Sequence, residues 1–172
     1  MDDETPLFRE KFRITSARRP GWDYADVGYY FVTINTKNRH PWFGEIQHQR
    51  MCLSETGSLV WQCWNAIPQH HPHIVLDRFI VMPDHLHGII RLNRTATLQR
   101  QPNDIIPWQR GVLGAVVNHF KGACSRFIRP IHPDFAWQSR FHDIIIRDNH
   151  ALGNMRRYID ENPLRWGGKD AL

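Results

Sequence analysis

Two histidines separated by one residue are the side chains in this sequence best placed to act together chemically. They lie in Phe79–Leu92, FIVMPDHLHGIIRL, where two apolar runs flank the turn-forming dipeptide Pro83-Asp84. On a strand, His85 and His87 would point to one face with Cβ atoms about 7 Å apart, so both imidazoles could bind one metal ion. A plain strand surface would explain the same pair, because two histidines do not complete a metal site.

A tyrosine and an asparagine near the C-terminus could supply a nucleophile and a further metal ligand. Tyr158 and Asn162 are spaced i, i+4 on a predicted helix from Asp148 to about Asn162, so their side chains share a face. Pro163 is expected to end this helix and to let the Asn162 carboxamide swing at its terminus. A tyrosine beside an apolar stripe and an ordinary capping asparagine would explain the pattern without chemistry.

The elements that must position these residues occur in the order β-α-β-β-α-β, followed by the last helix. Strands are predicted at 29–36, 74–82, 85–92 and 141–147, with a short edge strand at 42–46. Helices are predicted after the N-cap Ser54 and along an apolar stripe at 113–127. This order predicts an α+β, ferredoxin-like fold, which RNA-recognition modules share, with an antiparallel sheet and helices on one face. The first and third strands would be central.

The composition indicates one globular domain, residues 1–172, of the kind found in the cytoplasm. Hydrophobic residues make up 41% and charged residues 23%, and no apolar run approaches the ~20 residues of a membrane span. The start, MDDETPLFREKFR, lacks the apolar core of a signal peptide. Three cysteines form no CxxC motif, which favours a reduced protein.

Arginine dominates the positive charge of the chain. Of 22 basic residues only four are lysines, and the net charge is +5. Because guanidinium groups bind phosphate through two parallel hydrogen bonds, this bias suggests a polyanionic partner. A GC-rich genome would also favour arginine codons. Residues 1–27 are predicted to form a basic arm that either lies on nucleic acid or packs as an irregular segment.

Three ordered motifs closely resemble the single-tyrosine HUH transposases. They are MPDHLHGII around the histidines, WQSRFHDIIIR at 137–147 and YIDENPLRW at 158–166. The resemblance is strongest to the REP-associated branch, whose tyrosine helix reads YIxxNP, and it extends over about residues 29–166. Three motifs in order at compatible spacing are much more specific than any one of them.

The resemblance implies a metal-dependent single-strand DNA endonuclease and strand transferase that acts on hairpin-flanked DNA. It makes Tyr158 the catalytic nucleophile that forms a 5′-phosphotyrosine, and His85, His87 and Asn162 the ligands of Mg²⁺ or Mn²⁺. The same ligands would also bind Zn²⁺ or Ni²⁺. The insertion-sequence branch has glutamine where this chain has Asn162, so mobility of an element and processing of dispersed repeats both stay open. A nucleoid-associated location and either a monomer or a homodimer are compatible with the resemblance.

Several further side chains are candidate DNA contacts. These are Arg18, Arg19, Lys121, Trp137, Gln138, Arg156 and Arg157. Arg18 and Arg19 lie in the basic arm, whereas Arg156 and Arg157 flank the candidate nucleophile. Trp137 could stack on an unpaired base, although plain core packing would account for it equally well.

Other functions fit parts of the sequence. A domesticated protein could bind hairpin DNA without cleaving it. An RNA-recognition module would stack bases on strand aromatics, which residues 85–92 lack. A zinc hydrolase would need a third strong ligand and a general base, and no HExxH motif supplies them.

Six further residues have open roles. Two of His70, His71 and His73 could bind zinc, but a solvated loop is the simpler interpretation. His119 is expected to be a satisfied boundary residue. Asp84 could orient a histidine or only form the turn, and Gly88 suggests that something approaches the backbone closely.

Overall fold

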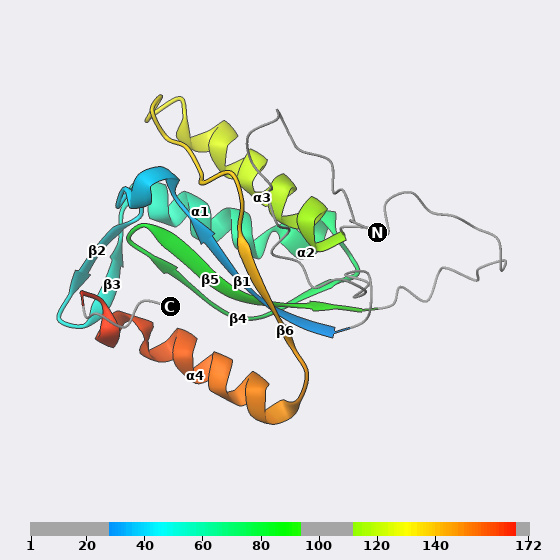
Figure 1. Ribbon diagram of the computed structural model, residues 1–172. Helices are drawn as coiled ribbons and strands as arrows, with labels where there is room; N and C mark the ends of the chain where they lie inside the picture. Colours follow the sequence, from blue (N-terminus) through cyan, green and yellow to red (C-terminus); the bar gives the residue numbers. More distant parts are fainter. Residues whose placement is uncertain (1–27, 94–111, 168–172) are drawn as a thin grey trace, which may run out of the picture.

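The computed structural model describes residues 28–93 and 112–167, so the predicted basic arm with Arg18 and Arg19 lies outside the described residues (Figure 1). Four strands form the main sheet: β1 (Gly28–Asn35), β4 (Ile74–Met82), β5 (His85–Leu92) and β6 (His142–Ile146). All neighbours are antiparallel and the order is β4-β5-β1-β6. The predicted ferredoxin-like arrangement, with the first and third of its strands at the centre, is therefore confirmed.

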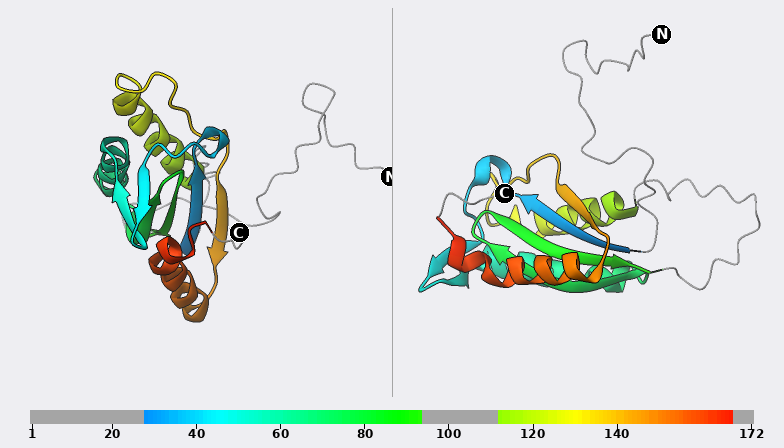
Figure 2. Two further views of the ribbon diagram at one scale, coloured as in Figure 1. Left: turned by 90° about the vertical axis from the view of Figure 1, so that its left-hand side faces the viewer. Right: turned by 60° about the horizontal axis from the view of Figure 1, so that its bottom comes forward.

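Helices cover both faces of this sheet. The helices α1 (Glu55–Asn65), α2 (Ile67–His70) and α3 (Val112–Ile128) lie on one face, and α4 (Asn149–Arg165) lies alone on the other (Figures 1 and 2). The short strands β2 (Gly44–Gln47) and β3 (Arg50–Leu53) form a separate hairpin, where the sequence had predicted only an edge strand at 42–46. No helix in the described part of the chain is long and apolar enough to span a bilayer.

Strand alternation divides the apolar side chains between two cores. On β1, Tyr30 and Val32 belong to the larger core beneath α1 and α3, whereas Phe31 belongs to a smaller core under α4. On β5, Leu86 enters the larger core, as predicted, and Ile89 the smaller one. The odd-numbered positions of β5 therefore face α4.

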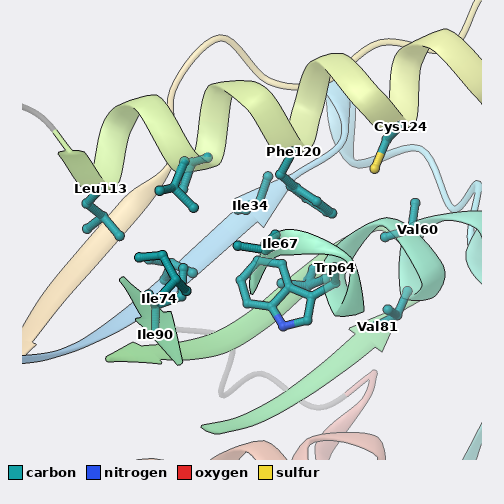
Figure 3. Packing of buried hydrophobic residues seen from close by; sticks show 14 of the residues in the cluster. Ile34, Val60, Trp64, Ile67, Ile74, Val81, Ile90, Leu113, Phe120 and Cys124 are labelled. Atoms are coloured by element: carbon teal, nitrogen blue, oxygen red, sulfur yellow. The ribbon is translucent and has the colours of Figure 1, made fainter. Parts of the chain in front are cut away.

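The larger core is organised around an indole. Trp64 projects from α1 toward Ile34 and Ile90 of the sheet and meets the ring of Phe120 from α3 edge to face, with centroids 5.2 Å apart (Figure 3). A Cβ atom at Gly88 would overlap the Trp64 ring. The close approach that the sequence suggested at Gly88 is thus made by a core tryptophan.

The predicted helix starts are confirmed, but the predicted end of the last helix is wrong. The side chains of Ser54 and Asp148 accept hydrogen bonds from Gly57 N at 3.1 Å and Ala151 N at 2.7 Å. The helix α4 continues through Pro163 to Arg165. A proline removes one intrahelical hydrogen bond, and Pro163 is nevertheless accommodated with its ring buried against the rest of the protein. Asn162 is therefore held within a helix and is not a swinging terminal residue.

Candidate active site

The imidazoles of His85 and His87 meet on the face of the sheet that α4 covers. Their Nε2 atoms are 3.0 Å apart, and the two residues are only 5% and 6% exposed. Antiparallel pairing with β1 places Asn35 opposite His85 and Thr33 opposite His87. The predicted convergence of the two rings is therefore present in the structure.

The second nitrogen of each ring has its own partner. His85 Nδ1 donates to Asp84 Oδ1 at 2.6 Å, and His87 Nδ1 lies 2.9 Å from the Thr33 hydroxyl. Because a carboxylate can only accept, the proton of a neutral His85 stays on Nδ1 and its Nε2 lone pair points toward His87. If His87 donates to Thr33, its lone pair points at the same spot, and two such lone pairs repel unless a cation lies near both. These residues thus fit a metal ion, and Asp84 is an orienting group as well as a turn residue.

The environment of His87 keeps that ring neutral. Burial lowers the pKa of the His87 imidazole to about 2, and the neighbouring His85 and Arg39 act in the same direction. A neutral imidazole retains the lone pair that a metal ion requires. The described residues, 28–93 and 112–167, contain no group of three or more His, Cys, Asp or Glu side chains that could hold a metal. Further ligands would have to include an amide, a water molecule or a substrate oxygen.

Helix α4 brings an aromatic ring against each histidine. The ring centroid of Tyr158 is 5.3 Å from that of His87, and Trp166 stacks on His85 at 6.0 Å. Asn162 is 8% exposed and lies one helical turn from each of these aromatic residues. Asn162 therefore shares a face of α4 with Tyr158, and its role as a metal ligand stays a prediction.

An ion pair anchors α4 to the edge strand β4. The Nε and Nη2 atoms of Arg156 donate to the two carboxylate oxygens of Asp77 at 2.8 and 2.5 Å. This fork lowers the pKa of the Asp77 carboxyl, chiefly through the hydrogen bond from Arg156. Arg156, a predicted DNA contact, thus has a structural partner two residues from Tyr158, whereas Arg157 is exposed.

The remaining predicted DNA contacts gather beyond the end of β1. Lys121 Nζ donates to the carbonyls of Gln138 at 2.8 Å and Arg140 at 3.1 Å. Trp137 donates to Lys121 O at 3.2 Å, and its ring packs among core phenylalanines. Gln138 accepts from Asn35 Nδ2 at 3.3 Å. These contacts explain how the side chains are held, while their role in binding DNA stays a prediction.

An open groove of about 680 Å³ runs along the outer face of α3, away from the histidines. Its lining residues are Lys121, Gly122, Ser125, Arg126, Arg129 and Pro130. Three cations in a groove of this kind suit a phosphate backbone. The groove extends the predicted contact at Lys121 to two arginines that the sequence motifs did not indicate.

Three residues at the site were not predicted from the sequence. Arg39 contacts Asp84, Thr33 contacts His87, and Trp166 covers His85. Thr33 could have been found by pairing the two central strands in register. The other two depend on a turn and on a helix extension for which the sequence carries no local signal.

A second group of imidazoles lies where α2 and the start of β4 meet α3. His71 Nε2 is 2.9 Å from His119 Nδ1, and the rings of His70 and His73 meet this pair edge to face. His73 Nε2 is buried and has no hydrogen-bond partner among the described residues. Burial first, and then the neighbouring histidines, lowers the pKa of His71. The predicted loop histidines and the predicted boundary residue His119 therefore form one cluster.

Comparison with known proteins places the chain among relatives of the same architecture. No protein-family model matches it. An uncharacterized protein of Haemophilus influenzae strain Rd is 35% identical over 159 residues, which span 88% of each chain. The solved structure of the REP-associated tyrosine transposase bound to a REP hairpin superposes with a TM-score of 0.60 at 19% identity, covering 90% of this chain and 75% of the other. The superposition on the transposase structure shows a shared fold, and this fold agrees with the resemblance predicted from the motifs.

Proposed function

The chain belongs to the same protein family as the Haemophilus influenzae protein, and from this premise, with its transposase-like fold, we propose that it cleaves and rejoins DNA strands. Its substrate would be single-stranded DNA flanked by a hairpin, because the solved structure of similar fold is bound to a REP hairpin. Transposition and processing of REP-type repeats are both forms of this activity. The abundance of arginine in the chain supports a nucleic-acid partner.

One observation carries the proposal: a tyrosine ring packs directly against the converging histidines. Tyr158 is 5.3 Å from His87 between ring centroids, while the Nε2 atoms of His85 and His87 converge within 3.0 Å. A nucleophile beside neutral nitrogen ligands is the arrangement that phosphodiester cleavage needs. A divalent cation, Mg²⁺ or Mn²⁺, held by His85, His87 and Asn162 would polarise the scissile phosphate and offset its negative charge.

The side chain of Tyr158 would perform the covalent step. Its phenolic oxygen attacks the phosphorus, the bond from phosphorus to the 3′ oxygen breaks, and a 5′-phosphotyrosine forms. The phenol loses its proton to water and the departing 3′ oxygen takes up a proton, so charge and protons balance. Because the phosphodiester energy is conserved in the tyrosyl ester, a 3′ hydroxyl can attack it later and rejoin the strands without ATP.

Other residues would orient the reacting groups. The Arg156–Asp77 fork and the small core under α4 fix the helix, and the helix fixes the position of Tyr158. Asp84 and Thr33 fix the rings of His85 and His87. The basic groove on α3 would hold the DNA backbone outside the reacting centre.

The test is covalent capture of DNA by Tyr158→Phe compared with the wild type. Incubation with labelled hairpin DNA and Mn²⁺, followed by denaturing electrophoresis, should show an adduct with the wild type and none with the variant. The substitution retains the ring contacts, so folding and hairpin binding should be preserved. Tyr29→Phe is the matched control, because Tyr29 pairs with Arg91 at the opposite end of β1 from the histidines.

Two outcomes would change the proposal. An adduct that persists in Tyr158→Phe would show that another residue is the nucleophile. Hairpin binding without an adduct from the wild type on any hairpin substrate would favour a domesticated protein that binds DNA without cleaving it.

A further inference from the structure

A strained turn follows β1 beside the candidate active site. Asn38 and Arg39 both have positive φ, 57° and 56°, in the left-handed region that side chains with a Cβ rarely adopt. They lie in the 3₁₀ turn η1 (Lys37–Arg39). Asparagine tolerates this conformation, so the strain falls on Arg39, and the contacts around Arg39 decide its role.

Hydrogen bonds hold the strained turn against the turn that precedes the histidines. Thr36 donates to Asp84 O through its backbone N at 2.9 Å and through its hydroxyl at 3.0 Å. The same hydroxyl lies 2.8 Å from His40 O, and Phe43 N donates to Pro83 O at 2.9 Å. The position of Arg39 is therefore set relative to Asp84 by the backbone as well as by its side chain.

The Asp84 carboxylate is shared between a guanidinium and an imidazole. Arg39 Nε lies 2.9 Å from Asp84 Oδ2, while His85 Nδ1 donates to Asp84 Oδ1 at 2.6 Å. Arg39 Nη1 also donates to Asn35 Oδ1 at 2.5 Å, and Asn35 is in turn held by Gln138. Each oxygen of Asp84 thus has one donor, which fixes the plane of the carboxylate.

We propose that Arg39 is a positioning residue that acts through Asp84. It holds the carboxylate in the orientation that keeps the His85 proton on Nδ1 and directs the Nε2 lone pair toward His87. The inference rests on the proposed function, because it assigns to Arg39 the alignment of one metal ligand.

Stability alone does not explain this ion pair. The Arg39 side chain is 45% exposed, so solvent screens its charge, and the 9% exposed Asp84 side chain already has His85 as a second partner. The surface pair Arg78–Asp160, at 3.5 Å and with both side chains more than half exposed, has no strained backbone beside it. The strained backbone at Arg39 brings its side chain to Asp84, which in turn orients His85, and this is the arrangement expected of a positioning residue.

The first test measures Mn²⁺ affinity of the full chain by isothermal titration calorimetry. Arg39→Gln should bind Mn²⁺ about 10-fold more weakly or worse, because residues that orient metal ligands typically contribute 10- to 100-fold. Asp84→Asn should show a similar loss of affinity. The double variant should bind Mn²⁺ within about 2-fold of Asp84→Asn, since both changes break the same connection from Arg39 through Asp84 to His85. Arg78→Ala is the matched control and should bind as the wild type does.

The second test observes the His85 tautomer without metal. Long-range ¹H–¹⁵N spectra should show a proton on Nδ1 of His85 in the wild type and a mixture of tautomers in Arg39→Gln. Arg39→Lys should restore part of the wild-type signal, because an ammonium can pair with Asp84 but cannot also reach Asn35 in the same fork. Circular dichroism of each variant confirms that the fold is retained.

Two results would overturn the inference. Unchanged Mn²⁺ affinity and an unchanged tautomer, with a raised KM for hairpin DNA, would place Arg39 on a DNA phosphate. Additive affinity losses in the double variant would show that Arg39 does not act through Asp84. If the wild type binds no Mn²⁺, the proposed function fails, and the tautomer measurement still decides the role of Arg39.

Discussion

Two pairs of imidazoles in this protein have nearly the same spacing and very different surroundings. In the buried pair, His85 and His87, the nearest ring nitrogens are 3.0 Å apart, and in the surface pair, His71 and His119, they are 2.9 Å apart. The buried pair lies on a central strand beneath α4. The surface pair joins the end of α2 to the exposed side of α3.

The difference lies in what the second nitrogen of each ring contacts. Asp84 and Thr33 each fix one ring of the buried pair, and Tyr158 packs against it. The surface pair is surrounded by further histidines, and no carboxylate in the described residues is paired with it. Spacing between histidines therefore identifies a candidate site only when partners orient the rings and a reactive group lies beside them.

The largest expected effect is a loss of cleavage activity when a histidine of the buried pair, but not of the surface pair, is replaced by alanine. His87→Ala should lower Mn²⁺-dependent cleavage of labelled hairpin DNA by about 10³-fold or more, because a lost metal ion removes several kcal/mol of transition-state stabilisation. His119→Ala should leave the cleavage rate within about 2-fold of the wild type, since surface substitutions have small effects. Equal losses in both variants would show that the surface pair takes part in the reaction.

A smaller effect is expected when the attachment of α4, the helix that covers only the buried pair, is weakened. Asp77→Asn removes the negative charge that pairs with Arg156 and so loosens α4. Because Tyr158 would then be positioned less well, adduct formation should slow by about 10-fold. His71→Asn should not change this rate. The measurement is the initial rate of adduct formation, and an unchanged rate in Asp77→Asn would show that the small core alone positions α4.

The same ion pair has a defined pH window. Because the pKa of Asp77 is lower in the folded than in the unfolded state, its contribution to stability is complete above the ordinary carboxyl pKa of 3.8 and is lost as pH falls through the folded pKa. The stability difference between wild type and Asp77→Asn, measured by urea unfolding, should therefore shrink below about pH 4.

The smallest effect is expected at the surface pair. The pKa of His71 is lower in the folded state, so below pH 6.5 the unfolded chain binds this proton more readily than the folded chain. The wild type should lose slightly more stability between pH 7.5 and 5 than His71→Asn does. Urea midpoints at the two pH values measure the difference, and parallel changes in the two proteins would contradict the expectation.

The sequence predicted those parts of the site that depend on local regularity. Strand alternation placed His85 and His87 on one face, and helical spacing placed Tyr158 and Asn162 together. The order of elements predicted the sheet, because short connections leave few alternatives.

The features that the sequence did not predict depend on backbone conformations for which it has no signal. The β2–β3 hairpin turns at His48 and Gln49, which both have positive φ without the glycine or asparagine that usually marks such a turn. Arg39 reaches Asp84 through a second turn, in which Asn38 signals positive φ but nothing in the sequence signals it at Arg39 itself. Trp166 reaches His85 because α4 continues past Pro163, against the usual preference of the residue before proline.

The two cores of the protein differ greatly in size. Among the described residues, twenty buried side chains form the core beneath α1 and α3, and only five form the one under α4. Because detaching α4 would expose far fewer buried side chains than global unfolding, we expect this helix to open at a lower free energy, once the Arg156–Asp77 ion pair is broken. Tyr158, the proposed nucleophile, would then leave the histidines and return with α4, while the central strand β5 keeps the imidazoles in place.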